Sequence, residues 1–186
     1  RCDLQLTDKQ RGVIKSVIPA AAMIVAGLCG GAFLIPSSAL PVDDPAARLA
    51  WALPWTLLPA LTLMISIMRV ANYRFASPQD IDGSGLTNGT PAMQILRAVL
   101  QNTLEQALLA VLAYCIWAVT LPLRWLGVIP AAAVLFVTGR IFFASGYARG
   151  AAGRATGFGL TAYPTFGMLV TTAVILIFRL IGRPVG

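Results

Sequence analysis

The chain has no histidine, little charge and few cysteines. Its 186 residues include three Cys, and 11% of the residues are charged. Without an imidazole, the protein cannot use a Ser-His-Asp triad or another histidine-based acid–base mechanism. Cys2, Cys29 and Cys115 stand apart from one another and form no CxxC pair. This spacing gives little support to a zinc site or a disulfide framework, and we expect no metal site.

Acidic side chains are absent from the long apolar runs, with one exception. Glu105 ends the polar string Arg97-Ala-Val-Leu-Gln-Asn-Thr-Leu-Glu, and an Ala- and Leu-rich run follows after Gln106. A lone carboxylate at membrane depth is costly, so it normally faces a polar cavity or a cationic partner. Glu105 is therefore the first candidate for a functional residue.

Apolar residues dominate the rest of the sequence. They make up 58% of the chain, and the mean hydropathy is +0.78, whereas ordinary soluble domains carry roughly 25% charged residues. Strict alternation of apolar and polar residues is absent, which argues against a membrane β-barrel. Five runs are each about as long as the ~20 residues that cross a bilayer: 13–35, 47–70, 93–121, 126–146 and 158–181. The sequence predicts an all-α integral membrane protein in which residues 1–186 form a single domain.

The positive charges are distributed unevenly between the two sets of helix ends. Fourteen Lys and Arg against seven Asp and Glu give a net charge of +7. Ten cations lie on the side of the N-terminus: Arg1, Lys9, Arg11, Lys15, Arg69, Arg74, Arg97, Arg140, Arg149 and Arg154. The other four are Arg48, Arg124, Arg179 and Arg183. The positive-inside rule then places the N-terminus in the cytoplasm and the C-terminus on the opposite side.

Tryptophans agree with this orientation. Trp51, Trp55, Trp117 and Trp125 all fall near the predicted outer boundary, where indole rings prefer to lie. The membrane setting accounts for the basic charge, so we expect the bilayer as a partner and no nucleic acid.

The third predicted helix carries a polar stripe. At 100° per residue, Arg97, Gln101 and Glu105 share one face, and Asn102 lies on the adjoining edge. The plainer interpretation is that Glu105 pairs with an arginine of a neighbouring helix and only fixes the packing.

The fourth predicted helix ends in a line of arginines. Arg140, Tyr147 and Arg154 recur every seven residues, so they lie near one line if the helix continues, with Phe143 beside them and Arg149 on another face. Arginines at a cytoplasmic helix end also bind lipid phosphates or merely snorkel.

Both polar features face the cytoplasmic half of the membrane, and Arg74 flanks the connection on the same side. Together they predict a pocket for a small anionic molecule that also carries a cationic group.

Two motifs in these segments resemble the MAPEG family, the membrane-associated proteins of eicosanoid and glutathione metabolism. The first is Asn-x-x-Glu at Asn102 and Glu105. The second is Arg-x-x-(Tyr/Phe)-x-x-Gly-Tyr-x-Arg-x-x-x-x-Arg, at Arg140, Phe143, Gly146, Tyr147, Arg149 and Arg154. The resemblance covers about residues 47–181. The segment 157–169 and the extra first helix look closest to the mattrin branch and its bacterial relatives.

The resemblance implies a four-helix bundle at 47–182 with an extra helix at 12–35. It also implies a homotrimer that holds glutathione between neighbouring subunits, near the cytoplasmic face. Arg154 would lie near the thiol and favour the thiolate, which attacks a lipophilic small molecule arriving from the bilayer. We predict Arg154 as the catalytic residue, and the predicted substrate-binding residues are Arg74, Arg97, Gln101, Asn102, Glu105, Arg140, Tyr147 and Arg149.

Three positions depart from the family pattern. Ala98 stands where catalytic members have an arginine, Phe143 replaces a tyrosine, and Gln106 replaces an aromatic residue of some members. Two functions therefore stay open. One is a glutathione transferase or peroxidase acting on lipophilic electrophiles. The other is a non-catalytic MAPEG-like protein that binds lipid or serves as a structural or regulatory trimer.

Overall fold

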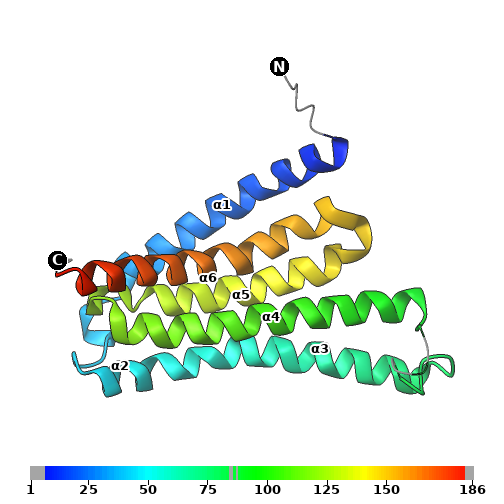
Figure 1. Ribbon diagram of the computed structural model, residues 1–186, viewed down its shortest axis with the longest axis horizontal. Helices are drawn as coiled ribbons and strands as arrows, with labels where there is room; N and C mark the ends of the chain where they lie inside the picture. Colours follow the sequence, from blue (N-terminus) through cyan, green and yellow to red (C-terminus); the bar gives the residue numbers. More distant parts are fainter. Residues whose placement is uncertain (1–6, 84–85, 87, 183–186) are drawn as a thin grey trace.

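The computed structural model describes residues 7–83, 86 and 88–182, which form helices joined by short turns and contain no strand. Six α-helices follow one another along the chain (Figure 1): α1 Asp8–Leu34, α2 Pro45–Ala52, α3 Leu57–Ala76, α4 Pro91–Thr120, α5 Val128–Gly146 and α6 Gly150–Leu180. The predicted all-α class is confirmed.

Four helical runs among the described residues are long and apolar enough to cross a membrane: Gln10–Leu34, Pro45–Ala76, Pro91–Thr120 and Leu123–Leu180. The fourth run has 58 residues and contains both α5 and α6. These two helices fold back on each other as an antiparallel hairpin (Figure 1). The chain is therefore a multi-pass membrane protein with a four-helix bundle, α3 to α6, and one additional N-terminal helix.

The second predicted helix, 47–70, is interrupted and extends further than expected. It consists of α2, a 3₁₀ segment at Leu53–Thr56, and α3, which continues to Ala76. Pro54 lies in the 3₁₀ segment and Pro59 in the first turn of α3. Proline lacks the backbone N–H and fixes φ, so it fits these two helix starts.

The turn between α5 and α6 decides the geometry of the predicted arginine line. The helix does not continue past Tyr147, because the chain passes through a 3₁₀ turn and reverses at Gly150, whose φ is +81°. Few residues other than glycine adopt this conformation without strain. Arg154 therefore returns on α6 instead of extending α5.

Glycines let α5 and α6 approach each other closely. A Cβ atom at Gly157 would overlap the backbone of Phe143, and one at Gly146 would overlap the carbonyl of Gly153. Small residues commonly allow such contact between membrane helices. The two backbones are consequently close enough for side chains of α5 to reach polar groups of α6.

The helix α1 packs along α6 and α5 (Figure 1). The Ser16 hydroxyl donates to the Ala152 carbonyl at 3.1 Å, and the Thr156 hydroxyl donates to the Ser16 carbonyl at 2.8 Å. Ala20 and Ile24 are buried in a small apolar cluster with residues of α5 and α6. These contacts fasten α1 to the hairpin.

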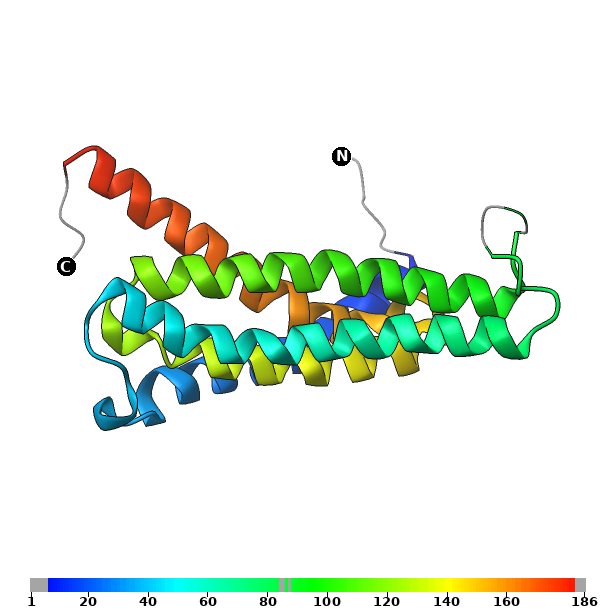
Figure 2. The ribbon, with the colours of Figure 1, turned by 90° about the horizontal axis from the view of Figure 1, so that it is seen from below.

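The bundle has two chemically different ends. One end, here named the tryptophan end, holds Trp51, Trp55, Trp117 and Trp125 around a core in which α4 contributes many alanines. The opposite end, named the loop end, holds the α3–α4 connection and the α5–α6 turn (Figure 2).

Candidate functional site

The hairpin of α5 and α6 carries a ladder of two aromatic rings with an arginine at each end. The Arg140 guanidinium carbon lies 4.4 Å from the centre of the Phe143 ring. Phe143 meets Tyr147 edge to face, with 5.4 Å between the ring centres. The Arg154 guanidinium carbon lies 4.6 Å from the centre of the Tyr147 ring. The two arginine–ring distances are cation–π distances. Arg140, Phe143, Tyr147 and Arg154 therefore form a chain of contacts across the turn, whereas the continuous helix expected to align them is not formed.

Arg140 anchors the ladder inside the bundle. It is 5% exposed. Its Nη1 donates to Asn102 Oδ1 on α4 at 2.8 Å, and its Nη2 donates to Thr161 Oγ1 on α6 at 2.5 Å. The Nε atom is buried without a hydrogen-bond partner among the described residues. One guanidinium thus connects three helices, because buried charges must be compensated by hydrogen bonds.

Arg154 lies at the other end of the ladder, in a pocket of about 190 Å³. The wall is otherwise apolar or aromatic and is shared by α1, α5 and α6: Val13, Val17, Phe143, Ala151, Ala155, Phe158 and Tyr163. Arg154 itself is half-buried. A guanidinium in apolar surroundings interacts strongly with any anion placed beside it.

Glu105 and Gln101 lie outside this ladder, on the exposed surface of α4. Gln101 Nε2 donates to Glu105 Oε1 at 2.9 Å, as their spacing of four residues predicts. No described residue forms an ion pair with Glu105. The expected pairing with a guanidinium is therefore not made within the described part of one chain, and the carboxylate faces outward from the bundle.

The remaining predicted residues lie nearer the loop end. Arg97 is half-buried on α4, next to Gly89, whereas Arg149 is exposed in the α5–α6 turn. Arg74 is half-buried in the last turn of α3 and is engaged with the α3–α4 loop. The structure brings together Asn102 with Arg140 and Tyr147 with Arg154, but it does not bring Arg74, Arg97 and Arg149 into the Arg154 pocket.

Asp80 organises the α3–α4 loop beneath Arg74. Its carboxylate accepts hydrogen bonds from the Thr90 backbone N–H at 2.8 Å, the Thr90 hydroxyl at 2.9 Å and the Ser77 hydroxyl at 2.7 Å. Burial raises the pKa of Asp80, but these bonds and the nearby Arg74 outweigh it and hold the pKa below its usual range. The role of Asp80 is structural, since its bonds hold Thr90, the residue that caps the N-terminus of α4.

The MAPEG family model matches residues 49–174, more than half of the chain. The chain belongs to the MAPEG family. No protein of curated function and no solved structure matches it. The matched range contains every predicted site residue, from Arg74 to Arg154, whereas α1 lies outside it.

The three departures from the MAPEG pattern have distinct settings in the structure. Phe143 uses its ring face to cover Arg140. Gln106 is buried, and its Oε1 has no hydrogen-bond partner among the described residues. Ala98 is half-buried, and the neighbouring cation on α4, Arg97, lies next to Gly89 of the α3–α4 loop.

Some residues around the site of this MAPEG protein were not predicted from the sequence. Thr161 holds Arg140, and Val13 and Val17 of the additional helix line the Arg154 pocket. A buried threonine in an apolar helix resembles any threonine that bonds its own backbone, which Thr161 also does. Only the packing of α1 and α5 against α6 distinguishes these residues. Among the described residues, no group of His, Cys, Asp and Glu could hold a metal ion.

Proposed function

We propose that this MAPEG protein binds glutathione and acts as a glutathione transferase or peroxidase on lipophilic electrophiles. The observation that carries the proposal is the Arg154 pocket, in which one cation meets an otherwise apolar wall. Such a pocket suits a thiolate on one side and a membrane-dissolved substrate on the other. Membership of a family active in glutathione and eicosanoid metabolism supports the same assignment.

The proposed glutathione site uses the polar residues of α4 and the ladder. Carboxylates of glutathione suit guanidiniums, and the γ-glutamyl ammonium suits Glu105, whose exposed carboxylate accepts from no described residue other than Gln101. Because Glu105 faces outward while Arg154 lies between α1, α5 and α6, we propose that neighbouring subunits of a homotrimer complete each site. The proposed binding residues are Arg74, Arg97, Gln101, Asn102, Glu105, Arg140, Tyr147 and Arg149.

The proposed chemistry needs only a stabilised thiolate. The thiol loses its proton to water, and the positive charge of Arg154 favours the resulting anion. The sulfur then attacks an electrophilic carbon, a C–S bond forms, and the leaving group departs with the bonding electrons. With a hydroperoxide, the thiolate sulfur would instead attack one peroxide oxygen. An S–O bond forms as the O–O bond breaks, and the other oxygen leaves as an alkoxide that takes up a proton. The thiol of a second glutathione then attacks the resulting sulfenic acid, which forms the disulfide and releases water.

A second candidate function is a non-catalytic member of the family that binds lipid or stabilises a trimer. The observation in its favour is that both terminal nitrogens of Arg140 are already bonded, to Asn102 and Thr161, and that Phe143 covers the guanidinium. An arginine that is held in this way and is only 5% exposed offers little accessible surface to a ligand. The likeness to the mattrin branch belongs with this candidate.

Calorimetric titration of glutathione into the detergent-solubilised protein separates binding from no binding. Thiolate absorbance in the ultraviolet and conjugation of a reactive aryl halide then test catalysis. We expect Arg154→Ala to abolish both signals and Arg154→Lys to retain part of both, because lysine keeps the charge but not the planar donor set. Glutathione binding weakens only modestly in either variant.

Arg69→Ala is the matched control, since it removes an exposed arginine of α3 outside the proposed site and leaves all three signals unchanged. If the wild-type protein binds glutathione without thiolate signal or conjugation, the catalytic proposal is wrong and the binding function stands. If it binds no glutathione, both forms of the proposal fail.

A further inference from the structure

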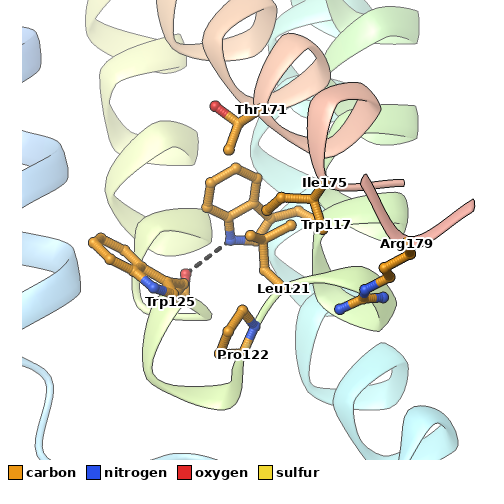
Figure 3. Close-up of a pocket in the computed structure, with 7 residues that line it drawn as sticks. All are labelled: Trp117, Leu121, Pro122, Trp125, Thr171, Ile175 and Arg179. Carbon is orange, nitrogen blue, oxygen red and sulfur yellow. Dashed lines mark hydrogen bonds between the residues drawn. The ribbon is translucent and has the colours of Figure 1, made fainter. Parts of the chain in front are cut away.

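A cavity of about 380 Å³ opens at the tryptophan end, far from Arg154 along the helices. The ends of α4 and α6 and the start of the α4–α5 connection line it: Trp117, Leu121, Pro122, Trp125, Thr171, Ile175 and Arg179 (Figure 3). Trp117 Nε1 donates to the Trp125 carbonyl at 2.8 Å, so the indole N–H is satisfied and its ring is held against the cavity. This hydrogen bond within the protein therefore fixes the orientation of the Trp117 ring.

A second cavity, of about 300 Å³, shares Trp117, Trp125 and Thr171 with the first. Its other walls come mainly from apolar residues of α1 and α6, including Leu28, Phe33 and Met168. The two cavities therefore form two lobes on either side of the tryptophan pair, here named the two-lobed groove. Figure 2 shows the C-terminal part of α6 diverging from α4 and α5, at the end of the bundle where residues of α6 line both cavities.

Two arginines lie near the two-lobed groove. Arg179 lines the first lobe, and Arg124 lines a neighbouring cavity together with Phe33 and Trp125, which also line the second lobe. Arg179 donates from Nη2 to the Thr120 carbonyl at 2.7 Å, which fixes its guanidinium beside the end of α4. The Arg124 guanidinium carbon lies 5.7 Å from the centre of the Trp125 ring. Both arginines are exposed, so both can meet an anion from outside the protein.

The described carboxylates at this end do not neutralise these two cations. Asp43 pairs with Arg48 at 3.3 Å, and Asp44 accepts from the Ala47 backbone N–H at the start of α2. Arg124 and Arg179 thus leave an excess of positive charge beside an apolar groove. Tryptophan and arginine together are typical of the boundary between acyl chains and headgroups.

We propose that the two-lobed groove binds an anionic phospholipid. The positive charges of Arg179 and Arg124 attract its anionic headgroup, and its two acyl chains occupy the two lobes, which share Trp117 and Trp125. The occupant is a lipid and not a second copy of the protein. The groove combines two apolar lobes, one for each acyl chain, with positive charge that no described carboxylate neutralises. The site is separate from the proposed glutathione site and does not depend on it.

Native mass spectrometry of the detergent-solubilised full chain tests the proposal directly. The probes are phosphatidylglycerol and phosphatidylcholine with identical acyl chains, added at equal concentration. We expect the wild-type protein to retain phosphatidylglycerol preferentially. In Arg124→Gln and Arg179→Gln, that preference falls by roughly five-fold per arginine removed, since each basic residue near an anionic surface contributes about that much.

Two further variants guard against misfolding and surface adsorption. Because Arg179 also caps α4, its replacement could disturb the fold, so a variant that keeps both arginines is needed. Thr171→Trp serves this purpose. Thr171 is exposed and borders both lobes, and a bulky ring there fills the groove without replacing an arginine. This variant loses the retained phosphatidylglycerol while its melting temperature in detergent is unchanged. Arg11→Gln, an exposed arginine of α1 at the loop end, keeps the preference.

Three results would overturn the proposal. The first is equal retention of the two lipids by the wild-type protein. The second is wild-type retention of phosphatidylglycerol by Thr171→Trp. The third is a change of oligomeric state in Thr171→Trp, measured by light scattering, which would assign the groove to a contact between copies of the chain.

Discussion

At the scale of single residues, Glu105 lacks a charged partner among the described residues of its own chain. A carboxylate in the middle of a membrane helix needs a partner, yet within the described chain it accepts only from Gln101. Its exposed position on α4 means that the partner must come from outside: a ligand, water or a neighbouring subunit.

The first prediction concerns Glu105→Gln. If Glu105 pairs with a buried cation of a neighbouring subunit, this variant assembles poorly, because that cation loses its counter-charge at a cost of about 3–5 kcal/mol. The fold of each chain changes little, since Gln preserves an oxygen for Gln101. Light scattering and thermal unfolding in detergent measure the two effects. Asp82→Asn, the same chemical change at an exposed loop residue, is the control. If Glu105→Gln assembles and melts like the wild-type protein, the Glu105 carboxylate is unpaired or hydrated.

Asp80 is the opposite case, since all its bonds lie within its own loop. Its pKa is held below the usual range, so its contribution to stability is present above pH ~4 and is lost as the pH falls further and the carboxylate takes up a proton. We expect Asp80→Asn to melt at a lower temperature than the wild type at neutral pH, with the difference shrinking in acid.

Melting curves in detergent across this pH range measure the effect of Asp80→Asn. Asp82→Asn should follow the wild-type curve at every pH, because Asp82 is exposed in the same loop. A pH-independent difference for Asp80→Asn would contradict the role of the ionised carboxylate.

Among the elements, the hairpin of α5 and α6 is decisive for the candidate site. The ladder exists because Gly150 reverses the chain and because Gly139, Gly146, Gly153 and Gly157 allow the two backbones to touch. Separating the helices would withdraw Thr161 from Arg140 and Tyr147 from Arg154.

We therefore predict that Gly157→Ala destabilises the protein by about 1–3 kcal/mol, the usual cost of overpacking, because the new methyl group overlaps the backbone of Phe143. Gly167→Ala is the matched control on the same helix, where nothing lies within 4 Å of the added Cβ. It should be neutral or slightly stabilising, since alanine favours helix more than glycine does. Equal melting temperatures for the two variants would contradict the close approach of α5 and α6.

At the scale of the whole molecule, charge and aromatic residues separate the two ends of the bundle. The tryptophans lie at one end and the α3–α4 loop at the other, as the sequence predicts. Which end faces the cytoplasm follows from the positive-inside rule and stays a prediction.

We predict that a cysteine at Asn88 is labelled from the cytoplasm and one at Ser38 from the opposite side. Both residues are exposed in connections between helices. The measurement uses a membrane-impermeant maleimide on intact and on permeabilised cells, with Cys2, Cys29 and Cys115 replaced. The reverse pattern would invert the orientation and place the Arg154 pocket in the other half of the membrane.

The sequence by itself determined the features that depend on neighbouring residues along the chain. Apolar runs set the membrane class, Thr90 and Pro91 start α4, and the four-residue spacing of Gln101 and Glu105 gives their hydrogen bond. The family motifs also singled out Arg140 and Arg154, and both lie within the range that the MAPEG model matches. These signals are local or rest on resemblance, so no tertiary contact is needed to read them.

Only the tertiary structure decided which helix faces meet. It placed Thr161 on Arg140, left Glu105 without a described guanidinium, brought Val13 and Val17 of α1 to the Arg154 pocket, and opened the groove beneath the end of α6. Helical periodicity gives the direction of each side chain around its own axis, but not the rotation or separation of neighbouring helices. In this chain the close glycine contacts and the reversal at Gly150 set those two quantities.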